Sequence, residues 1–354
     1  MSAAQGVIDR YRPFLNIPEH TQNITLLEGS TPLIPMPKIA EELGKGCKVW
    51  VKYEGLNPTG SFKDRGMTVA ISEAVGRGAK AVMCASTGNT AASAAAYAAR
   101  CGMRAIVLIP KGKVATGKLA GAVAYGADVF QIDGSFDDAL SLVVEISNRT
   151  PIALVNSLNP FRLEGQKTAA FEIYDELAFS PDWLCLPVGN AGNISAYWMG
   201  FKEYHDLKGI PLPRILGVQA EGSAPLVLGH PVENPETIAT AIRIGKPARG
   251  EQALIAAEES KGRIIAVSDD EILVAQRKLA ASGVWVEPAS AAGLAGLLHE
   301  IRAGRFNADG KRIAIVCTGH GMKDPDIIAA SMPAPRLIPA KADALEEAIS
   351  GSGK

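Results

Sequence analysis

Short apolar runs rich in β-branched residues alternate with longer segments of helical periodicity along most of this chain. Nine runs have the length and composition of strands, namely residues 48–54, 81–86, 105–110, 127–132, 152–156, 183–188, 215–220, 263–268 and 312–319. Helical spacing of apolar residues is found at 68–78, 89–102, 117–126, 136–148 and 165–177. Strands that are apolar throughout and separated by helices are typical of parallel sheets covered on both faces. The pattern therefore predicts an α/β fold.

The number of expected strands also bears on domain organisation. Nine strands exceed what one compact doubly wound sheet usually holds, and the sequence shows neither an internal repeat nor a low-complexity linker. We therefore expect two interleaved lobes, each a mostly parallel sheet flanked by helices. Residues 1–53 with 158–332 would form the larger lobe and 54–157 the smaller, followed by a C-terminal tail at 333–354 whose polar end, residues 341–354, is expected to be frayed. Residues 222–260 show no clear strand, so we expect short helices and loops there.

The composition argues against several classes of function. Lys and Arg number 36 against 37 Asp and Glu, a formal net charge of −1, so nothing favours nucleic acid or an anionic membrane as partner. No apolar stretch approaches the ~20 residues of a spanning helix, and the N-terminus lacks a secretory pattern. The five cysteines are scattered and no Cys/His cluster has zinc spacing. This favours reduced thiols, a cytoplasmic location and no metal.

Four turns at the ends of expected strands are rich in Gly, Asn, Ser and Thr, and they comprise residues 57–65, 86–90, 189–193 and 317–321. In open α/β sheets, ligands bind at the carboxyl ends of the strands. Each turn alone could be an ordinary turn, but four together predict a ligand site. A further loop at 112–119 nearly matches a Walker A sequence. It ends in Leu119, where a hydroxyl should ligate magnesium, which argues against nucleotide triphosphate binding.

Two of these turns have chemistry that can be stated from the residues alone. Lys63 opens an expected helix directly after Phe62, and the helix dipole with partial burial would lower the pKa of its amine toward that of a nucleophile. The alternative is a solvated lysine on the shoulder of a helix. The 189–193 turn follows a strand and opens another helix, so its backbone N–H groups can converge on a phosphate.

With these residues in view, the chain resembles the fold type II, tryptophan-synthase-β-like, pyridoxal-phosphate enzymes, and within them the threonine synthases. Residues 61–65 (SFKDR) match the cofactor-lysine motif of that family, and residues 86–89 (STGN) match its asparagine loop. More discriminating are the segments 156–162 (NSLNPFR), 189–193 (GNAGN) and 318–324 (TGHGMKD). The resemblance implies the fold of this family and pyridoxal 5′-phosphate as cofactor.

The resemblance also implies roles for individual residues. Lys63 would form the Schiff base with the cofactor and later move protons, and Asn89 would bind the 3′-oxygen of the cofactor. Thr318 would face the pyridine nitrogen, where a hydroxyl, unlike a carboxylate, cannot hold the ring as a full pyridinium. The phosphate would be held in the larger lobe by the backbone of Gly189, Asn190, Ala191, Gly192 and Asn193.

The implied reaction converts O-phospho-L-homoserine and water into L-threonine and phosphate, the final step of threonine biosynthesis. The substrate carboxylate would bind polar groups at a helix start, namely Ser86, Thr87 and Asn89. Its phosphate would bind Arg162 together with Ser157 and Thr87, because a guanidinium can engage phosphate through two hydrogen bonds. The alternative for Arg162 is a surface ion pair with Glu164.

Several alternatives stay open. A threonine or serine dehydratase on the same fold would not need Arg162 as a phosphate ligand. A nucleotide-binding protein would use the Gly-rich turns without Lys63, and a non-catalytic relative would hold the cofactor without turnover. The family also implies a homodimer. His320 is expected to shape the site, since Lys63 already supplies a base, while Asp64 and Arg65 could form an ion pair at the helix start.

Overall fold

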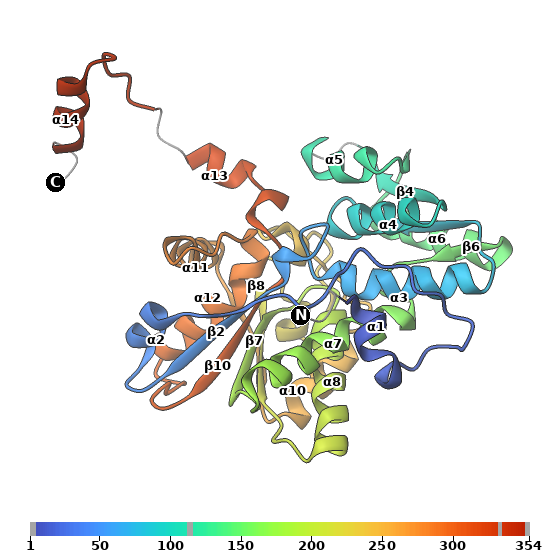
Figure 1. Ribbon diagram of the computed structural model, residues 1–354, viewed down its shortest axis with the longest axis horizontal. Helices are drawn as coiled ribbons and strands as arrows, with labels where there is room; N and C mark the ends of the chain where they lie inside the picture. The colour runs from blue at the N-terminus through green and yellow to red at the C-terminus, as the bar shows by residue number, and fades with distance from the viewer. Residues whose placement is uncertain (1–4, 112–115, 332–334, 351–354) are drawn as a thin grey trace. The chain divides into compact units, whose positions relative to one another are not determined.

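The computed structural model describes residues 5–111, 116–331 and 335–350 of the chain. It comprises two units, Met1–Asp324 and Pro325–Lys354. The second unit contains α13 (Asp326–Ser331) and α14 (Ala342–Ser350) (Figure 1). The expectation of a frayed tail was therefore wrong for the residues of α14. The Walker-like loop lies in part outside the described residues, at positions 112–115.

The larger sheet of the first unit has six strands in the order β1-β2-β10-β7-β8-β9. Its strands are β1 (Leu33–Pro35), β2 (Lys48–Tyr53), β7 (Trp183–Pro187), β8 (Arg214–Ala220), β9 (Arg263–Val267) and β10 (Arg312–Cys317). Neighbouring strands are parallel except for β1, which runs antiparallel to β2. Central β10 pairs on both sides, so Ile315 lies opposite Val51 and Cys185. The edge strand β1 was missed because a three-residue run carries no readable periodicity.

The smaller sheet has four parallel strands in the order β5-β4-β3-β6. They are β3 (Ala81–Ala85), β4 (Arg104–Pro110), β5 (Asp128–Ile132) and β6 (Ile152–Leu154). In the sequence, β2 of the larger sheet precedes all four and β7 follows them, so the two sheets are interleaved. The predicted α/β fold with two mostly parallel sheets is confirmed. The lobe boundaries stated above stay a prediction.

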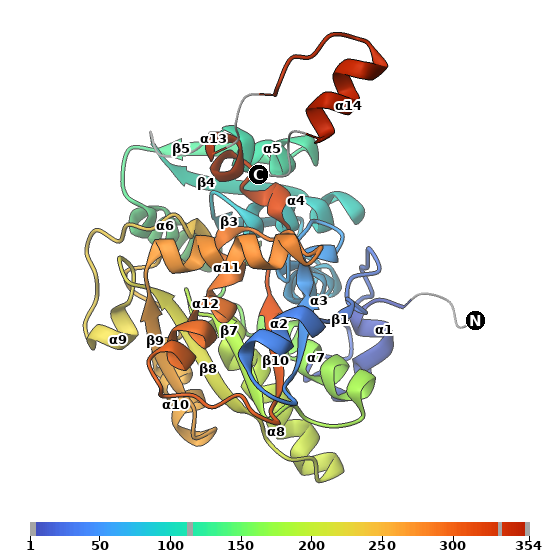
Figure 2. The same cartoon turned by 90° about the vertical axis from the view of Figure 1, so that its left-hand side faces the viewer.

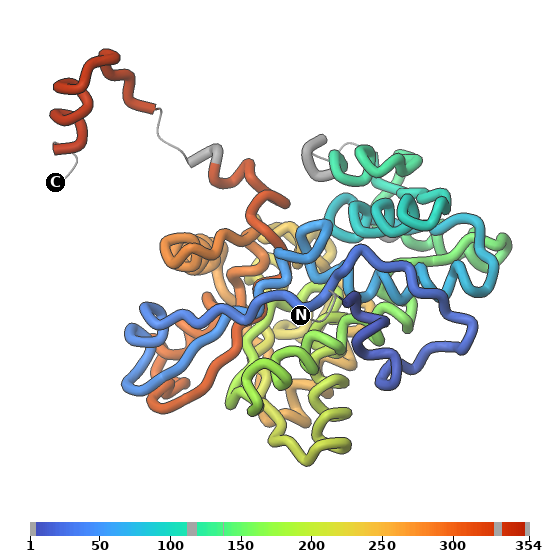
Figure 3. The backbone as a smooth tube through the Cα atoms, in the orientation of Figure 1, coloured from blue at the N-terminus to red at the C-terminus, as the bar shows by residue number. Residues whose placement is uncertain are grey.

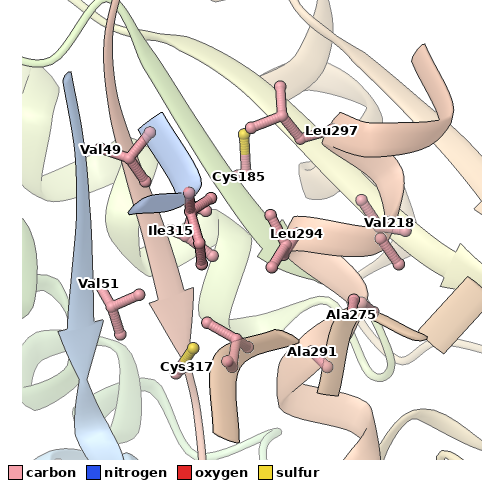
Figure 4. Close-up of a cluster of buried hydrophobic side chains, with 14 of the residues drawn as sticks. Val49, Val51, Cys185, Val218, Ala275, Ala291, Leu294, Leu297, Ile315 and Cys317 are labelled. Atoms are coloured by element: carbon pink, nitrogen blue, oxygen red, sulfur yellow. The ribbon is translucent and has the colours of Figure 1, made fainter. Parts of the chain in front are cut away.

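Helices cover both faces of the larger sheet (Figures 1 and 2). One face packs against α2 (Pro37–Leu43), α11 (Asp269–Ala281) and α12 (Pro288–Arg302). Figure 4 shows this core, in which Leu294 of α12 lies near Cys185 and Ile315 of the sheet. The opposite face packs against α1 (Val7–Tyr11), α7 (Pro160–Leu177), α8 (Gly192–Lys208) and α10 (Gly250–Glu259). The strands are apolar throughout because both faces are buried.

The smaller sheet is enclosed in the same way. The helices α3 (Lys63–Gly76), α4 (Asn89–Arg100) and α5 (Thr116–Ala124) contribute to the core on one face, and α6 (Phe136–Arg149) covers the other. The backbone trace in Figure 3 shows the N-terminal segment, whose helix α1 packs against α3 and α7. Within 222–260 the structure has α9 (Pro225–Leu228), a 3-10 helix at Thr240–Ile242 and α10, as expected. Across residues 5–111, 116–331 and 335–350, no helix has both the length and the apolar character needed to cross a membrane.

Candidate active site

The polar turns that follow β2 and β10 meet directly. The backbone N–H of Phe62 donates to the carbonyl oxygen of Thr318 at 2.9 Å, and Ser61 forms an antiparallel bridge with Gly319. These contacts follow from the topology, because β2 and β10 are parallel neighbours whose carboxyl ends lie at the same edge of the sheet. Lys63 therefore begins α3 one residue after a contact with the 317–321 turn.

Lys63 lies in an environment that favours the neutral amine. Its Nζ atom is 3.9 Å from the centroid of the Phe62 ring, and its side chain keeps only part of its surface accessible. Burial, and to a smaller extent the positive charge of Arg162, lower the pKa of Lys63 to about 7, while Glu287 opposes both. A solvated lysine would not have this environment. The amine can therefore act as a nucleophile or base close to neutral pH.

Asn89 begins α4 and contacts a residue that the motifs did not indicate. Its Nδ2 atom donates to Oε1 and Oε2 of Glu287 at 3.0 and 3.1 Å. Glu287 is only 5% exposed and directly precedes Pro288, the first residue of α12. A carboxylate before a helix-opening proline was the one signal in the sequence, and it is too common to have marked a site.

Gly319 and Gly321 are required because neighbouring side chains lie too close to admit a Cβ atom at either position. A side chain at position 319 would collide with Oε1 of Glu287, and one at position 321 would collide with the ring of Trp285. Neither glycine is needed for a positive φ angle, since neither belongs to the left-handed residues of the chain. The glycines therefore bring the turn close to the Trp285–Glu287 segment.

Thr318 is buried and its hydroxyl lies 2.7 Å from the hydroxyl of Ser290, with either atom able to donate. Ser290 also accepts a hydrogen bond from the backbone N–H of Gly319 at 2.7 Å. Ser290 was not identified from the sequence, yet it fixes the position of the Thr318 side chain. The ring of His320 stacks on that of Tyr53, with centroids 6.0 Å apart, which agrees with a role in shaping the site.

The 189–193 turn forms an anion cradle at the start of α8. Ala191 adopts a left-handed conformation (φ 65°) and precedes Gly192, the first residue of the helix. A helix start presents backbone N–H groups with no intrahelical acceptor, together with the positive end of the dipole. Glycine suits position 189, because a Cβ atom there would lie only 3.0 Å from Cα of Ile242. The buried Nδ2 atom of Asn193 finds no partner in the described part of the chain.

Arg162 is a buried cation rather than a surface one. It is 2% exposed, and its Nη1 atom donates to the carbonyl oxygen of Val155 at 2.7 Å. Its Nε atom is buried and has no acceptor among residues 5–111, 116–331 and 335–350. Glu164 instead binds Lys167 at 2.6 Å and the backbone of Asn16 at 2.8 Å, so the alternative of a surface ion pair was wrong. Burial lowers the pKa of Arg162 to about 10, which leaves it charged at neutral pH.

The suggested ion pair between Asp64 and Arg65 was also wrong. Asp64 accepts hydrogen bonds from the backbone and the hydroxyl of Thr59, each at 2.6 Å. Arg65 binds the carboxylates of Glu54 and Glu172, each at 2.6 Å. The side chains of successive helix residues point in different directions, so Asp64 and Arg65 contact different neighbours.

The predicted substrate residues come together through a side-chain amide. Asn156 donates to the carbonyl oxygen of Ala85 and accepts from its backbone N–H, both at 2.9 Å. This pairing brings Ser157 beside the loop that contains Ser86 and Thr87. The hydroxyl of Ser86 accepts from the backbone of its own loop, and all three of these predicted residues keep partly accessible surfaces.

Arg249 connects that region to the anion cradle, although sequence reasoning assigned no function to its segment. Its Nε atom donates to the carbonyl oxygen of Ser157 at 3.0 Å and its Nη2 atom to that of Leu158 at 3.3 Å. Its backbone N–H donates to the carbonyl oxygen of Asn190 at 3.3 Å, and Ala248 donates to the side chain of Asn190. The segment before α10 therefore holds the cradle against the 156–162 segment.

The residues present fit pyridoxal phosphate. Of the eleven buried polar side-chain atoms without a partner among the described residues, three lie in the motifs of this site, namely Ser61 Oγ, Arg162 Nε and Asn193 Nδ2, and Gln166 Oε1 lies one helical turn after Arg162. A lysine of lowered pKa suits an aldehyde, the amide of Asn89 suits an aromatic oxygen, and the Thr318 hydroxyl suits a ring nitrogen. The start of α8 suits a phosphate. The four functional groups of the cofactor thus each have a suitable partner.

Comparison with known proteins agrees with this geometry. The family model described as "Pyridoxal-phosphate dependent enzyme" matches residues 24–319. The threonine synthase of Synechocystis sp. is 60% identical over 324 residues, which cover 91% of this chain and 84% of that protein. The threonine synthase of Mycobacterium leprae is 56% identical over 347 residues, covering 97% of this chain and 96% of that protein.

Solved structures of lower identity share the fold. A fungal L-serine ammonia-lyase from Rhizomucor miehei has a TM-score of 0.73 at 24% identity, covering 86% of this chain and 97% of that one. A cysteine synthase from Entamoeba histolytica has a TM-score of 0.72 at 23% identity, covering 88% of this chain and 90% of that one. At these identities the similarity establishes the arrangement of sheets and helices alone.

Proposed function

The chain belongs to the pyridoxal-phosphate-dependent enzymes and, within them, to the threonine synthases, and from that premise we propose the reaction and the residues that perform it. The enzyme is a lyase that converts O-phospho-L-homoserine and water into L-threonine and phosphate. The observation that carries this assignment is the buried guanidinium of Arg162, whose charge acts on Lys63. This substrate brings a second phosphate into the site, whereas dehydration of a hydroxyamino acid does not.

Four elements would hold the cofactor. Lys63 would attach it covalently, Asn89 would donate to its 3′-oxygen and Thr318 would lie toward its ring nitrogen, while the backbone of residues 189–193 would bind its phosphate. Bound pyridoxal phosphate supplies an electron sink for the negative charge that develops at the α-carbon of the substrate. The neutral hydroxyl of Thr318, held by Ser290, is a weaker partner for a pyridinium than a carboxylate would be.

Lys63 performs the proton transfers in this proposal. Its lowered pKa gives a substantial fraction of neutral amine near pH 7, so it can take the α-proton of the substrate and then a β-proton. The side chain starts at the first residue of α3, an element fixed by packing, which limits the directions in which Nζ can reach. One amine can thus serve two adjacent carbon atoms in succession.

Arg162 would bind the phosphate of the substrate with help from Ser157 and Thr87. A guanidinium without a carboxylate partner has donors available for a phosphate, and burial strengthens the interaction by excluding water. As the bond between the γ-carbon and oxygen breaks, this cation stabilises the charge on the leaving phosphate. The start of α4, with Ser86 and the backbone N–H of Asn89, would receive the substrate carboxylate.

We also propose that the enzyme is a homodimer in the cytoplasm, with small molecules as its only ligands. All five cysteines, each inside the described ranges, are unpaired, which supports a reducing compartment. The net charge of −1 gives no support for nucleic acid as a partner. Light scattering coupled to size-exclusion chromatography measures the mass in solution, and a monomeric mass would contradict the dimer.

Product analysis tests the proposed function. Purified enzyme loaded with pyridoxal phosphate is mixed with O-phospho-L-homoserine, and phosphate and threonine are measured in the same sample. We expect equal amounts of both products. Parallel samples with L-threonine or L-serine are assayed for a 2-oxoacid. Efficient 2-oxoacid formation without phosphate release from the phosphorylated substrate would identify a dehydratase and reject the proposal.

A further inference from the structure

A buried carboxylate that belongs to none of the predicted motifs lies among the proposed cofactor residues. Both oxygen atoms of Glu287 accept from Nδ2 of Asn89, at 3.0 and 3.1 Å. The backbone N–H of Glu287 donates to the carbonyl oxygen of Gly319 at 3.1 Å, and its carbonyl oxygen accepts from Ser290 at 2.9 Å. The residue is therefore anchored by its main chain to the same turn that presents Thr318.

The position of the carboxylate is also set by steric contact. It lies so close to Cα of Gly319 that any side chain at that position would collide with Oε1. Glu287 is 5% exposed, so water cannot substitute freely for its protein partners. A buried carboxylate is costly unless it is bound by donors and cations. The charge of Glu287 therefore requires hydrogen-bond donors or cations close to it.

The charged groups that face Glu287 come from two segments. Lys63 at the start of α3 and Lys323 after the 318–321 turn are cations, and Asp324 is an anion. Burial raises the pKa of Glu287, while the hydrogen bond from Asn89 and the two lysines lower it. In return, Glu287 is the charge that opposes the lowering of the Lys63 pKa.

We propose that Glu287 is a positioning residue, which holds the amide of Asn89 with its nitrogen toward the cofactor ring and places a negative charge beside the amine of Lys63. This inference rests on the proposed function. An amide nitrogen carries two hydrogens. One binds Glu287, and the other remains for the 3′-oxygen of the cofactor. Without Glu287, the amide can turn and present its oxygen, which repels an anionic 3′-oxygen.

Two substitutions of Glu287 distinguish its effect on the orientation of the Asn89 amide from the effect of its negative charge on Lys63. Glu287→Gln keeps an oxygen that can accept from Asn89 but removes the negative charge. Glu287→Ala removes both. The matched control is Glu300→Gln, because Glu300 is a buried carboxylate on the adjoining helix α12 that binds Arg263 and Arg305 instead of the site.

The experiment uses full-length protein freed of cofactor and reloaded with pyridoxal phosphate. Fluorescence titration gives the Kd for the cofactor, and stopped-flow absorbance gives the rate of cofactor incorporation from pH 6 to 10. Glu287→Ala should weaken cofactor binding by about tenfold, the effect of losing a hydrogen bond to a charged group. Glu287→Gln should change Kd by less than about threefold and move the midpoint of the pH profile down by about one unit, because it removes an anion beside Lys63. Glu300→Gln should change neither quantity.

Three outcomes would overturn the inference. In the first, Glu287→Ala binds cofactor with the wild-type Kd. In the second, Glu287→Gln leaves the pH profile in place. In the third, Glu300→Gln produces the same losses, which would indicate general destabilisation. Failure of the proposed function has a different signature, since wild-type protein would then bind the cofactor but release no phosphate and threonine from O-phospho-L-homoserine.

Discussion

Two groups of buried charges surround the first turn of α3, and they differ in how their charges are balanced. The paired cluster consists of Lys52, Glu54, Arg65 and Glu172. Arg65 binds Glu54 and Glu172 at 2.6 Å, and Lys52 binds Glu172 at 2.7 Å. Two cations face two anions, and none of the four side chains is more than 3% exposed. Burial alone would raise the pKa of Glu172, but Arg65 and Lys52 together hold it well below its usual range.

The open cluster consists of Lys63, Arg162 and Glu287. No ion pair joins Arg162 to a carboxylate within the ranges that the structure describes, and burial lowers the pKa of Lys63 to about 7. Arg162 and Glu287 act on Lys63 in opposite directions, because the cation lowers its pKa and the carboxylate raises it. The positive charge that the protein leaves uncompensated would be balanced by the negative charges of the cofactor and the substrate.

In this fold, the balance of charges in a buried cluster indicates its role. A balanced cluster fixes one segment against another, here α3 against α7 and β2, and breaking it costs stability. An unbalanced cluster weakens the unliganded protein and is retained where a ligand completes it. Residues 63 and 65 lie on the same helix turn, so proximity in sequence does not decide which role a charged residue has.

Removing the amine of the open cluster should have the largest effect. Lys63→Ala should lower threonine formation by about a thousandfold or more, since it removes both the covalent attachment and the base. Steady-state assays measure this loss, and mass spectrometry after borohydride reduction measures attached cofactor. Lys202→Met is the control, because Lys202 forms a surface pair with Glu259. Substantial activity in Lys63→Ala would reject the role of this lysine.

Breaking the paired cluster should affect stability instead. Glu172→Ala leaves Arg65 and Lys52 without their shared anion and should lower the free energy of unfolding by about 3–5 kcal/mol. Urea denaturation followed by circular dichroism measures this change. A loss below about 1 kcal/mol, the range typical of exposed ion pairs, would show that the cluster does not stabilise the fold.

Removing Arg162, the second cation of the open cluster, should lower activity but not stability, unlike Glu172→Ala in the paired cluster. Arg162→Met should lower kcat/KM for O-phospho-L-homoserine by about a hundredfold, because a charged hydrogen-bond donor to the phosphate is lost. Its free energy of unfolding should stay within about 1 kcal/mol of wild type or increase, since the arginine has no carboxylate partner to lose. A stability loss as large as that of Glu172→Ala would mean that Arg162 has a structural role.

Most of the fold could be predicted from the sequence because its strands are buried on both faces. All nine expected runs became strands, whereas the edge strand β1 has three residues and no pattern to detect. Helix α14 was missed because a short polar segment has the same composition whether it is helical or frayed.

The candidate site was predictable only where its residues lie in motifs. Lys63, Asn89, Thr318 and the 189–193 turn lie in such segments, and their proposed roles follow from resemblance to a family. Glu287, Ser290 and Arg249 were not found because their significance arises from contacts between distant parts of the chain. Asn89 and Glu287, for example, are separated by 198 positions. Nothing local to Glu287 indicates which amide it will bind.

The smallest expected effect is a pH dependence that only the open cluster should show. Wild-type protein without cofactor should incorporate pyridoxal phosphate with a rate that rises with pH and is half-maximal near pH 7, because the neutral amine of Lys63 is the reactive form. Below the pKa, the rate should fall about tenfold per pH unit as the amine is protonated. Arg162→Met should move the midpoint upward, since a cation that disfavours protonation is removed, whereas Glu172→Gln in the paired cluster should leave it unchanged. Stopped-flow absorbance measures each profile. A wild-type rate that continues to rise to pH 10 would mean that Lys63 has the pKa of an ordinary lysine, and the distinction between the two clusters would lose its main support.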